Sequence, residues 1–168
     1  MALLTGNPNL SDGSPVFHAS RGNIAAAGAD PDASTLSAAR LAMRGFKGLD
    51  GKTLISVTPK YLLVGPSLET AAEKLLASIY AVSTDDVNAF AGKLSLLVEP
   101  RITDDRWYVF ADPARIACMA YGYLASAQGV QMQRAEAWDT LGMKYRAFLD
   151  FGAGWLDWRG AYFNVGAA

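Results

Sequence analysis

The chain has 168 residues, of which 51% are hydrophobic and 18% are charged, and its formal net charge is −1. This composition supports a sizeable core, excludes wholesale disorder, and argues against a dedicated nucleic-acid binder, which needs a surplus of Lys and Arg. No stretch approaches the roughly 20 uninterrupted apolar residues of a membrane span, so no membrane partner is predicted. The only cysteine, Cys118, lies in an apolar run and is expected to be a small buried hydrophobe.

Residues 1–33 are rich in Gly, Ala, Asn, Asp, Ser and Pro. Such a composition predicts turns and irregular coil, with one short extended piece at Val16-Phe17. A compact domain rarely opens with so long a segment without regular structure. We therefore expect this lead segment to pack on another part of a larger chain or on a neighbouring subunit.

An amphipathic helix is predicted to follow, with Asp32 or Ser34 as its cap. Its apolar stripe, at spacings of 3, 4 and 3 residues, consists of Leu36, Ala39, Met43 and Phe46. A basic ridge at positions i, i+4 and i+7 consists of Arg40, Arg44 and Lys47. This ridge has two interpretations: a contact surface for an acidic partner, or a solvated helix face with cations near the C-terminal end of the dipole.

Two β-type segments, Thr53–Val57 and Lys60–Val64, lie on either side of Pro59, which cannot donate to a ladder and marks a break or an edge. The segment from about Pro66 to Tyr80 predicts the clearest helix of the chain, amphipathic enough to lie on a sheet. Its apolar positions are Leu68, Ala71, Ala72, Leu75, Leu76 and Ile79.

The pattern then changes to strands, predicted over 93–100, 106–112, 115–124 and 143–151 after a polar loop at 83–93. The segment that follows residue 151 is expected to continue the last strand, with Asp157 and Arg159 pairing with neighbouring strands and fixing register. Together the elements predict an α+β fold, with two amphipathic helices on one side of a mainly antiparallel sheet and extended C-terminal strands.

The stretch Gly65-Pro66-Ser67-Leu68-Glu69 is one residue away from the G-x-S-x-G turn that carries a serine nucleophile. Glu69 stands where that turn needs a small residue, and the only histidine, His18, precedes the serine. We favour a helix start in which Ser67 or Gly65 is the cap and Pro66 occupies the first turn. A serine hydrolase that uses Ser67 is the alternative.

No cofactor and no metal site are predicted. The chain has no phosphate-binding loop motif, and one His and one Cys are too few for a metal cluster. The adjacent pairs Asp85-Asp86 and Asp104-Asp105 are interpreted as solvated turn residues.

Aromatic residues concentrate in the strings RWYVF and GWLDWRGAYF, beside Arg106 and Arg159. Stacked on bases, they would make a module that binds single-stranded nucleic acid, which is a second alternative. Their strand-like alternation and the lack of a basic surplus favour a core or a subunit interface.

Four strings occur in order: LSAARLAMRGFKGLDGKTL, PKYLLVGPSLETAAEKLL, LLVEPRI with RWYVFADPA, and YRAFLDFGAGWLDWRGAYFN. Together they resemble the major head subunit (major capsid protein) family of Mu-type phages and prophages. The preceding string, GNPNLSDGSPVFHASRGNIAAAG, is similar to the loop by which the same family enters this region. The resemblance covers nearly the whole chain.

The resemblance implies the Hong Kong 97-type capsid fold, of which this chain resembles the C-terminal half. Residues 1–33 would then be an irregular lead segment, 34–124 an axial-type α+β domain, and 125–168 the end of the sheet with return strands toward the peripheral domain. The implied function is structural, not enzymatic. Copies of the chain would associate with each other and with other head proteins into an icosahedral shell that encloses DNA, contacting the DNA only indirectly.

The same resemblance implies assembly in the bacterial host cytoplasm and a final location in the virion. Loop 83–92 is the candidate for contacts near a symmetry axis, through Thr84, Asp85, Asp86 and Asn88. The basic ridge is the candidate for contacts with acidic loops of the adjacent subunit. Asp157 and Arg159 complete the candidate interface residues.

Overall fold

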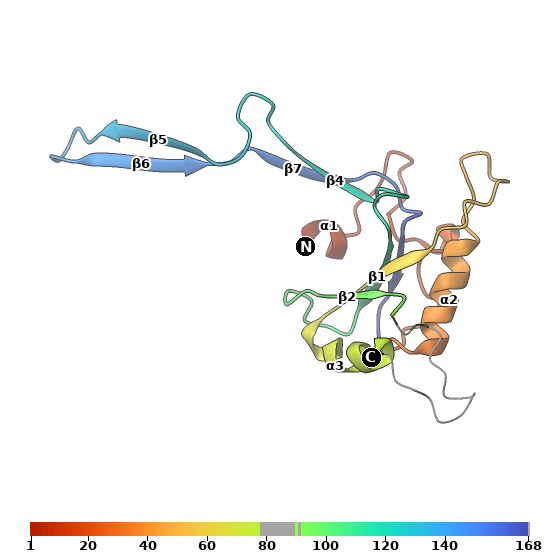
Figure 1. The fold of residues 1–168 in the computed structure, drawn as a ribbon. Coiled ribbons are helices and arrows are strands. Elements are labelled where there is room, and N and C mark those ends of the chain that lie inside the picture. The colour runs from red at the N-terminus through yellow and green to blue at the C-terminus, as the bar shows by residue number, and fades with distance from the viewer. Residues whose placement is uncertain (78–89, 91, 168) are drawn as a thin grey trace. The chain divides into compact units, whose positions relative to one another are not determined.

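The computed structural model describes residues 1–77, 90 and 92–167. By its internal contacts the chain divides into two units, shown in Figure 1: unit 1 is Met1–Cys118 with Trp155–Ala168, and unit 2 is Met119–Gly154. The division expected from the sequence, with boundaries after residues 33 and 124, stays a prediction.

Unit 1 contains a four-stranded sheet in the order β2-β1-β3-β8. Its strands are β1 (Pro59–Val64), β2 (Ser95–Val98), β3 (Trp107–Ala111) and β8 (Ala161–Asn164). Strands β1 and β2 run parallel, whereas β1 with β3 and β3 with β8 run antiparallel. The helical elements are α1 (Ala2–Thr5), η1 (Ala19–Arg21), α2 (Ala33–Arg44), η2 (Pro66–Leu68) and α3 (Glu69–Leu76). The predicted α+β fold with a mainly antiparallel sheet is confirmed.

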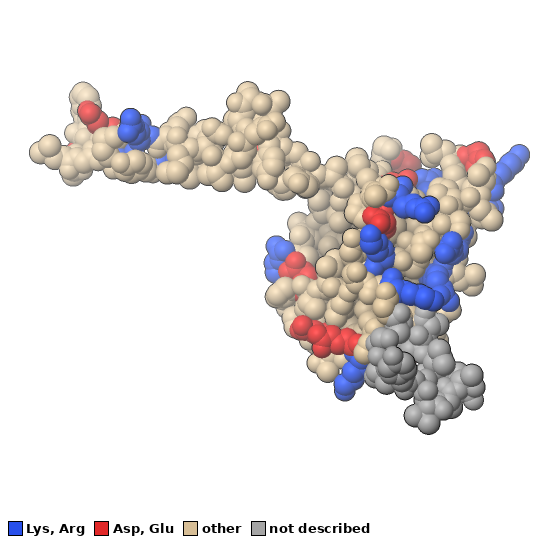
Figure 2. Space-filling model, viewed as in Figure 1, with Lys and Arg blue, Asp and Glu red and all other residues tan. Residues whose placement is uncertain are grey.

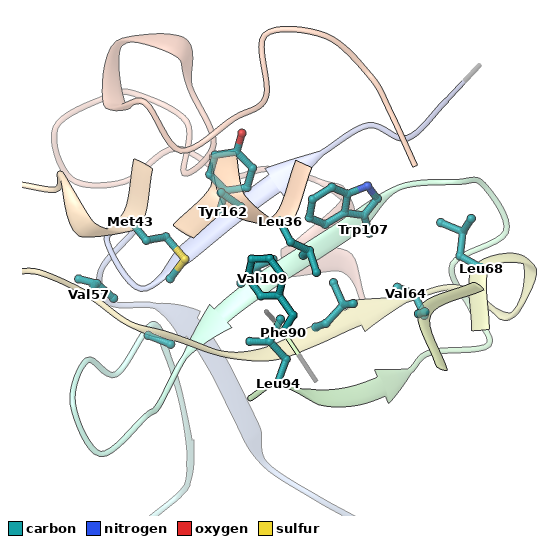
Figure 3. Packing of buried hydrophobic residues seen from close by; sticks show 14 of the residues in the cluster. Leu36, Met43, Val57, Val64, Leu68, Phe90, Leu94, Trp107, Val109 and Tyr162 are labelled. Atoms are coloured by element: carbon teal, nitrogen blue, oxygen red, sulfur yellow. The ribbon is translucent and has the colours of Figure 1, made fainter. Parts of the chain in front are cut away.

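The main core lies between one face of this sheet and the two helices α2 and α3 (Figure 3). Alternation along β3 sends Trp107 and Val109 into this core, because successive side chains of a strand point to opposite faces. From the helices come Leu36, Ala39, Met43, Leu68 and Ala72. Both helices therefore cover the same face of the sheet, as predicted.

The opposite face of the sheet is covered by the lead segment. Val16 and Phe17 are buried there in a second cluster with Tyr108 of β3. The buried side chain of Asn23 holds the segment in place, since its amide nitrogen donates to the carbonyl of Val16 at 2.8 Å and its oxygen accepts from the backbone of His18 at 3.0 Å. The lead segment therefore packs on the sheet of its own unit, whereas we expected it to pack on a larger chain or a neighbouring subunit.

Helix α2 begins where its cap was predicted. Asp32 accepts from the backbone N–H of Thr35 at 2.6 Å, and the hydroxyl of Thr35 accepts from the backbone N–H of Asp32 in return. The bond from Thr35 lowers the pKa of the Asp32 carboxyl. The helix ends at Arg44, because Gly45 takes the C-cap position.

Two predictions about the following segment need correction. Thr53–Val57 is not a strand, since only Leu54 within it makes an isolated bridge, to Lys47, and the backbone of Ser56 has a positive φ of 54°. The predicted helix from Pro66 begins as the 3-10 helix η2, and α3 ends at Leu76 with an extended Ala77, short of the predicted end. Residues 78–80 lie outside the described residues.

Unit 2 consists of two pairs of strands. Strands β4 (Met119–Tyr123) and β7 (Phe151–Trp155) form a two-stranded sheet, as do β5 (Gln131–Glu136) and β6 (Met143–Phe148), which run antiparallel. The predicted strand over 143–151 is interrupted after Phe148, and β5 was not predicted.

Cys118 is buried, as predicted, and burial raises the pKa of its thiol from 9.0 to about 12, with a smaller contribution from the negative charge of Asp157. At pH 8 the thiolate is then rarer than in the unfolded chain by a factor on the order of 10³. We expect iodoacetamide to label native Cys118 more slowly than the urea-unfolded chain by at least about a hundredfold. Equal labelling rates, followed by mass spectrometry, would contradict this burial.

The same pKa shift makes stability fall at high pH. In the folded state the thiol keeps its proton to a higher pH than in the unfolded chain. Its contribution to the free energy of unfolding is therefore complete below pH 9.0 and is lost as the pH rises toward about 12.

Candidate interface surfaces

Helix α2 carries two of the three predicted basic residues. Arg40 is half-buried, and its guanidinium carbon lies 4.7 Å from the centre of the Phe90 ring. Arg44 is exposed, and its Nη1 donates to the hydroxyl of Ser56 at 2.9 Å. Lys and Arg side chains gather over this helix in Figure 2. Arg44 therefore presents the more accessible of the two charges.

Lys47 does not continue the helical ridge. The helix ends at Arg44, so a residue three positions later lies in the following loop, where Lys47 is exposed and bridges to Leu54. The predicted i, i+4, i+7 ridge is wrong in this respect, because the sequence pattern was extended through the cap at Gly45.

Asp157 and Arg159 lie in the turn between β7 and β8, not on a strand. The carboxylate of Asp157 accepts from the backbone N–H of Arg159 at 2.9 Å and from its Nη1 at 3.2 Å, which closes the turn. Arg159 Nε also donates to the carbonyl of Lys47 at 2.8 Å, and its guanidinium lies 4.8 Å from the Trp158 ring centre. The predicted pairing with neighbouring strands is wrong. The two side chains instead fasten the loop after α2 to the turn before β8.

The predicted loop residues Thr84, Asp85, Asp86 and Asn88 lie outside the described residues. Their role stays a prediction.

The second acidic pair is described and its two members point to different partners. Asp104 accepts from Arg106 Nε at 2.7 Å, which lowers the pKa of the Asp104 carboxyl. Asp105 accepts from the hydroxyl of Ser67 at 3.2 Å. Within the described part of the chain, no three His, Cys, Asp or Glu side chains are grouped so as to hold a metal ion.

Ser67 and His18 are engaged in separate places. Ser67 lies in η2 and does not cap a helix, because Gly65 takes the N-cap position without a side-chain bond. The ring of His18 lies 2.7 Å from the hydroxyl of Ser20, and His18 is the N-cap of η1. Ser67 therefore contacts the carboxylate of Asp105, whereas His18 contacts Ser20, and no described hydrogen bond joins Ser67 to His18.

Helix α3 offers a surface of the opposite charge to that of α2. Glu69 and Glu73 are spaced i, i+4 and so lie on one side of the helix, and Glu73 is exposed. Acidic side chains are visible over this helix in Figure 2. Unit 1 therefore carries a basic and an acidic surface on two different helices.

Sequence reasoning missed the apolar surface of unit 2. The exposed large hydrophobic residues of this unit are Met119, Tyr121, Tyr123, Leu124, Val130, Met132, Trp138, Leu141, Met143, Tyr145, Phe148, Leu149 and Phe151. Among them Tyr121 and Tyr123 contact the ring of Phe151, with centroids 5.9 and 5.6 Å away. Exposed apolar surface of this extent marks interaction sites. The sequence signal for this surface was the alternation of apolar residues at 143, 145, 147, 149 and 151, which we interpreted as a half-buried strand.

A model of a phage capsid protein family matches residues 1–164. The chain belongs to the phage capsid protein family. No curated protein matches it. A solved structure from Mycobacterium phage Che8 is similar at 16% sequence identity and a TM-score of 0.49, over 88% of this chain and 55% of that one. The chain thus spans about half the length of that protein.

The family match confirms the predicted capsid function at the level of the family. No helix within residues 1–77, 90 and 92–167 has the length and apolar character to cross a bilayer. In a capsid protein, exposed charged and apolar surfaces are candidates for subunit contacts. Among the described residues, the surfaces of α2, α3 and unit 2 are three such candidates.

Proposed function

We propose that this chain is the major head subunit of a Mu-type phage or prophage, or the C-terminal part of one, with the Hong Kong 97-type capsid fold. Copies of it associate with each other and with other head proteins into an icosahedral shell that encloses DNA. The observation that carries the proposal is the capsid family match over residues 1–164. The two helices on a mainly antiparallel sheet support it.

In this proposal the protein is not an enzyme, assembles in the bacterial host cytoplasm and ends in the virion. Its contact with packaged DNA is indirect, which agrees with a formal net charge of −1. Residues 34–124 form the axial-type domain, and loop 83–92 lies near a symmetry axis of the shell.

The contacts between subunits in this proposal are heterologous, joining different surfaces of two copies. The basic surface of Arg40, Arg44 and Lys47 meets an acidic surface of the next copy, for which Glu69 and Glu73 of α3 are candidates. Head-to-tail contacts of this kind close into rings when the rotation between copies permits.

The proposed location is tested on phage particles from the bacterial strain that carries the gene. An antibody raised against the chain is expected to place gold label on the head shell, and the protein is expected among the most abundant proteins of purified heads. Its absence from purified particles would overturn the proposal.

Charge reversal on α2 tests the proposed contact. In the assembling protein, Arg40→Glu with Arg44→Glu is expected to lower the yield of sedimenting particles by about tenfold or more, because like charges then oppose each other. Arg44→Glu alone, whose side chain makes one described bond, to Ser56, is expected to give a smaller loss. Arg115→Glu, which reverses an exposed cation elsewhere, is the control. Unchanged particle yield with unchanged circular dichroism would rule the contact out.

A further inference from the structure

The ribbon of β5 and β6 has two unlike faces. In its register Arg134 lies opposite Tyr145, Glu136 opposite Met143, and Met132 opposite Ala147. Alternate residues of a strand share a face. One face, here called the Met–Tyr face, therefore consists of Met132, Arg134, Glu136, Met143, Tyr145 and Ala147. The other, called the Gln–Lys face, consists of Gln131, Gln133, Ala135, Lys144, Arg146 and Phe148.

The two cations of the Gln–Lys face, Lys144 and Arg146, each have a partner within the ribbon. Arg146 Nε donates across the ribbon to the side-chain oxygen of Gln133 at 2.8 Å, and its guanidinium lies 5.7 Å from the centre of the Phe148 ring. Lys144 Nζ donates to the carboxylate of Asp139 at 3.2 Å. Each cation of this face thus has a partner within the ribbon.

The Met–Tyr face is different. Met132 is 71% exposed and Tyr145 is 67% exposed. Among the described residues, the side chains of Arg134 and Glu136 take part in no ion pair and no side-chain hydrogen bond. A two-stranded ribbon is marginally stable in water by itself, and exposed apolar side chains such as those of Met132 and Tyr145 mark an interaction surface.

We propose that the Met–Tyr face binds the same face of a second copy of this chain, with the two β5 strands antiparallel. The inference rests on the proposed function, in that it names one surface through which copies associate. It is carried by charge complementarity, since the face has one positive and one negative side chain two residues apart on a single strand.

A two-fold axis between these residues makes the face complementary to itself. Arg134 of each copy then meets Glu136 of the other, and Tyr145 meets Met143 of the other. The contact thus pairs both charges and covers the apolar side chains of the face.

The test uses the whole 168-residue chain and two variants, Arg134→Glu and Glu136→Arg, in sedimentation equilibrium over a concentration series. Each variant alone places like charges in both pairs, so each is expected to weaken self-association by about tenfold or more. An equimolar mixture of the two variants restores opposite charges in both pairs. It is expected to associate within about threefold of the wild type.

Two further variants sharpen the test. The double variant Arg134→Glu with Glu136→Arg is expected to associate by itself, and Lys144→Glu, on the Gln–Lys face, is expected to leave association unchanged. A mixture no stronger than its components would show that the two charges act only within one chain, and would overturn the proposal. A wild type that stays monomeric throughout the series would overturn it as well.

Failure of this inference is distinct from failure of the proposed function. If gold label lies on the head shell but the mixture of variants does not restore association, the proposed capsid function stands and the proposed contact is wrong. If the mixture restores association but no particle carries label, the proposed contact stands and the proposed location is wrong.

Discussion

Replacing Trp107 with Ala is expected to lower the free energy of unfolding of unit 1 by about 4 kcal/mol. The side chain is 0% exposed, and it lies in the core between β3 and the two helices (Figure 3). Its indole nitrogen donates to the carbonyl of Ala29 at 2.8 Å. The substitution therefore leaves a large cavity and removes the partner of a carbonyl that holds the lead segment near the sheet.

The matched control is Trp138→Ala, the same change at a side chain that is 99% exposed. It is expected to alter the unfolding of unit 1 by less than about 0.5 kcal/mol. Urea unfolding followed by circular dichroism, at low protein concentration, gives both values. A loss below about 1 kcal/mol at Trp107 would contradict the packing described for β3.

Strands and helices with strong local signals were predicted correctly from the sequence. The cap at Asp32 and the apolar stripe of α2 are both local, since a helix begins where its first free N–H groups find an acceptor. Strand β3 follows from the apolar run that includes Trp107 and Val109 between two turns. The prediction that Arg40 and Arg44 lie on the helix was also correct, since α2 extends to Arg44.

Features that depend on distant parts of the chain were not predictable in this way. The burial of Val16 and Phe17 depends on the far face of the sheet, which no local pattern reveals. The role of Arg159 depends on the carbonyl of Lys47, which is 112 residues away in sequence. Strand β5 was missed because Gln, Arg and Glu interrupt its apolar positions, so it reads as loop unless its pairing with β6 is known.

The interface surfaces show the same division between local and distant information. The cations of α2 could be found from spacing alone, but the spacing did not show that Arg40 lies against Phe90 and that Lys47 lies beyond the helix. The Met–Tyr face of the ribbon emerges only from the cross-strand register, which decides the residues that share a face.

Replacing Gly160 with Ala is expected to destabilise unit 1 by about 2 to 3 kcal/mol. Gly160 is buried in the turn before β8, where its carbonyl accepts from the backbone N–H of Ala111 at 2.8 Å. A Cβ atom at this position would lie within 3.0 Å of the sulfur of Cys118, closer than real Cβ atoms approach a neighbour, and 3.2 Å from Cγ2 of Ile116. The turn therefore has to shift, or the thiol has to move.

A double-mutant cycle with Cys118→Ala identifies the cause of that loss. Removing the sulfur costs about 1 kcal/mol by itself, but it opens the space that the new methyl group needs, so the double variant is expected to lose about 1 to 2 kcal/mol less than the sum of the single losses. Gly122→Ala is the control, because a Cβ there meets nothing within 4 Å. Additive losses in urea unfolding would show that the strain does not arise from the contact with Cys118.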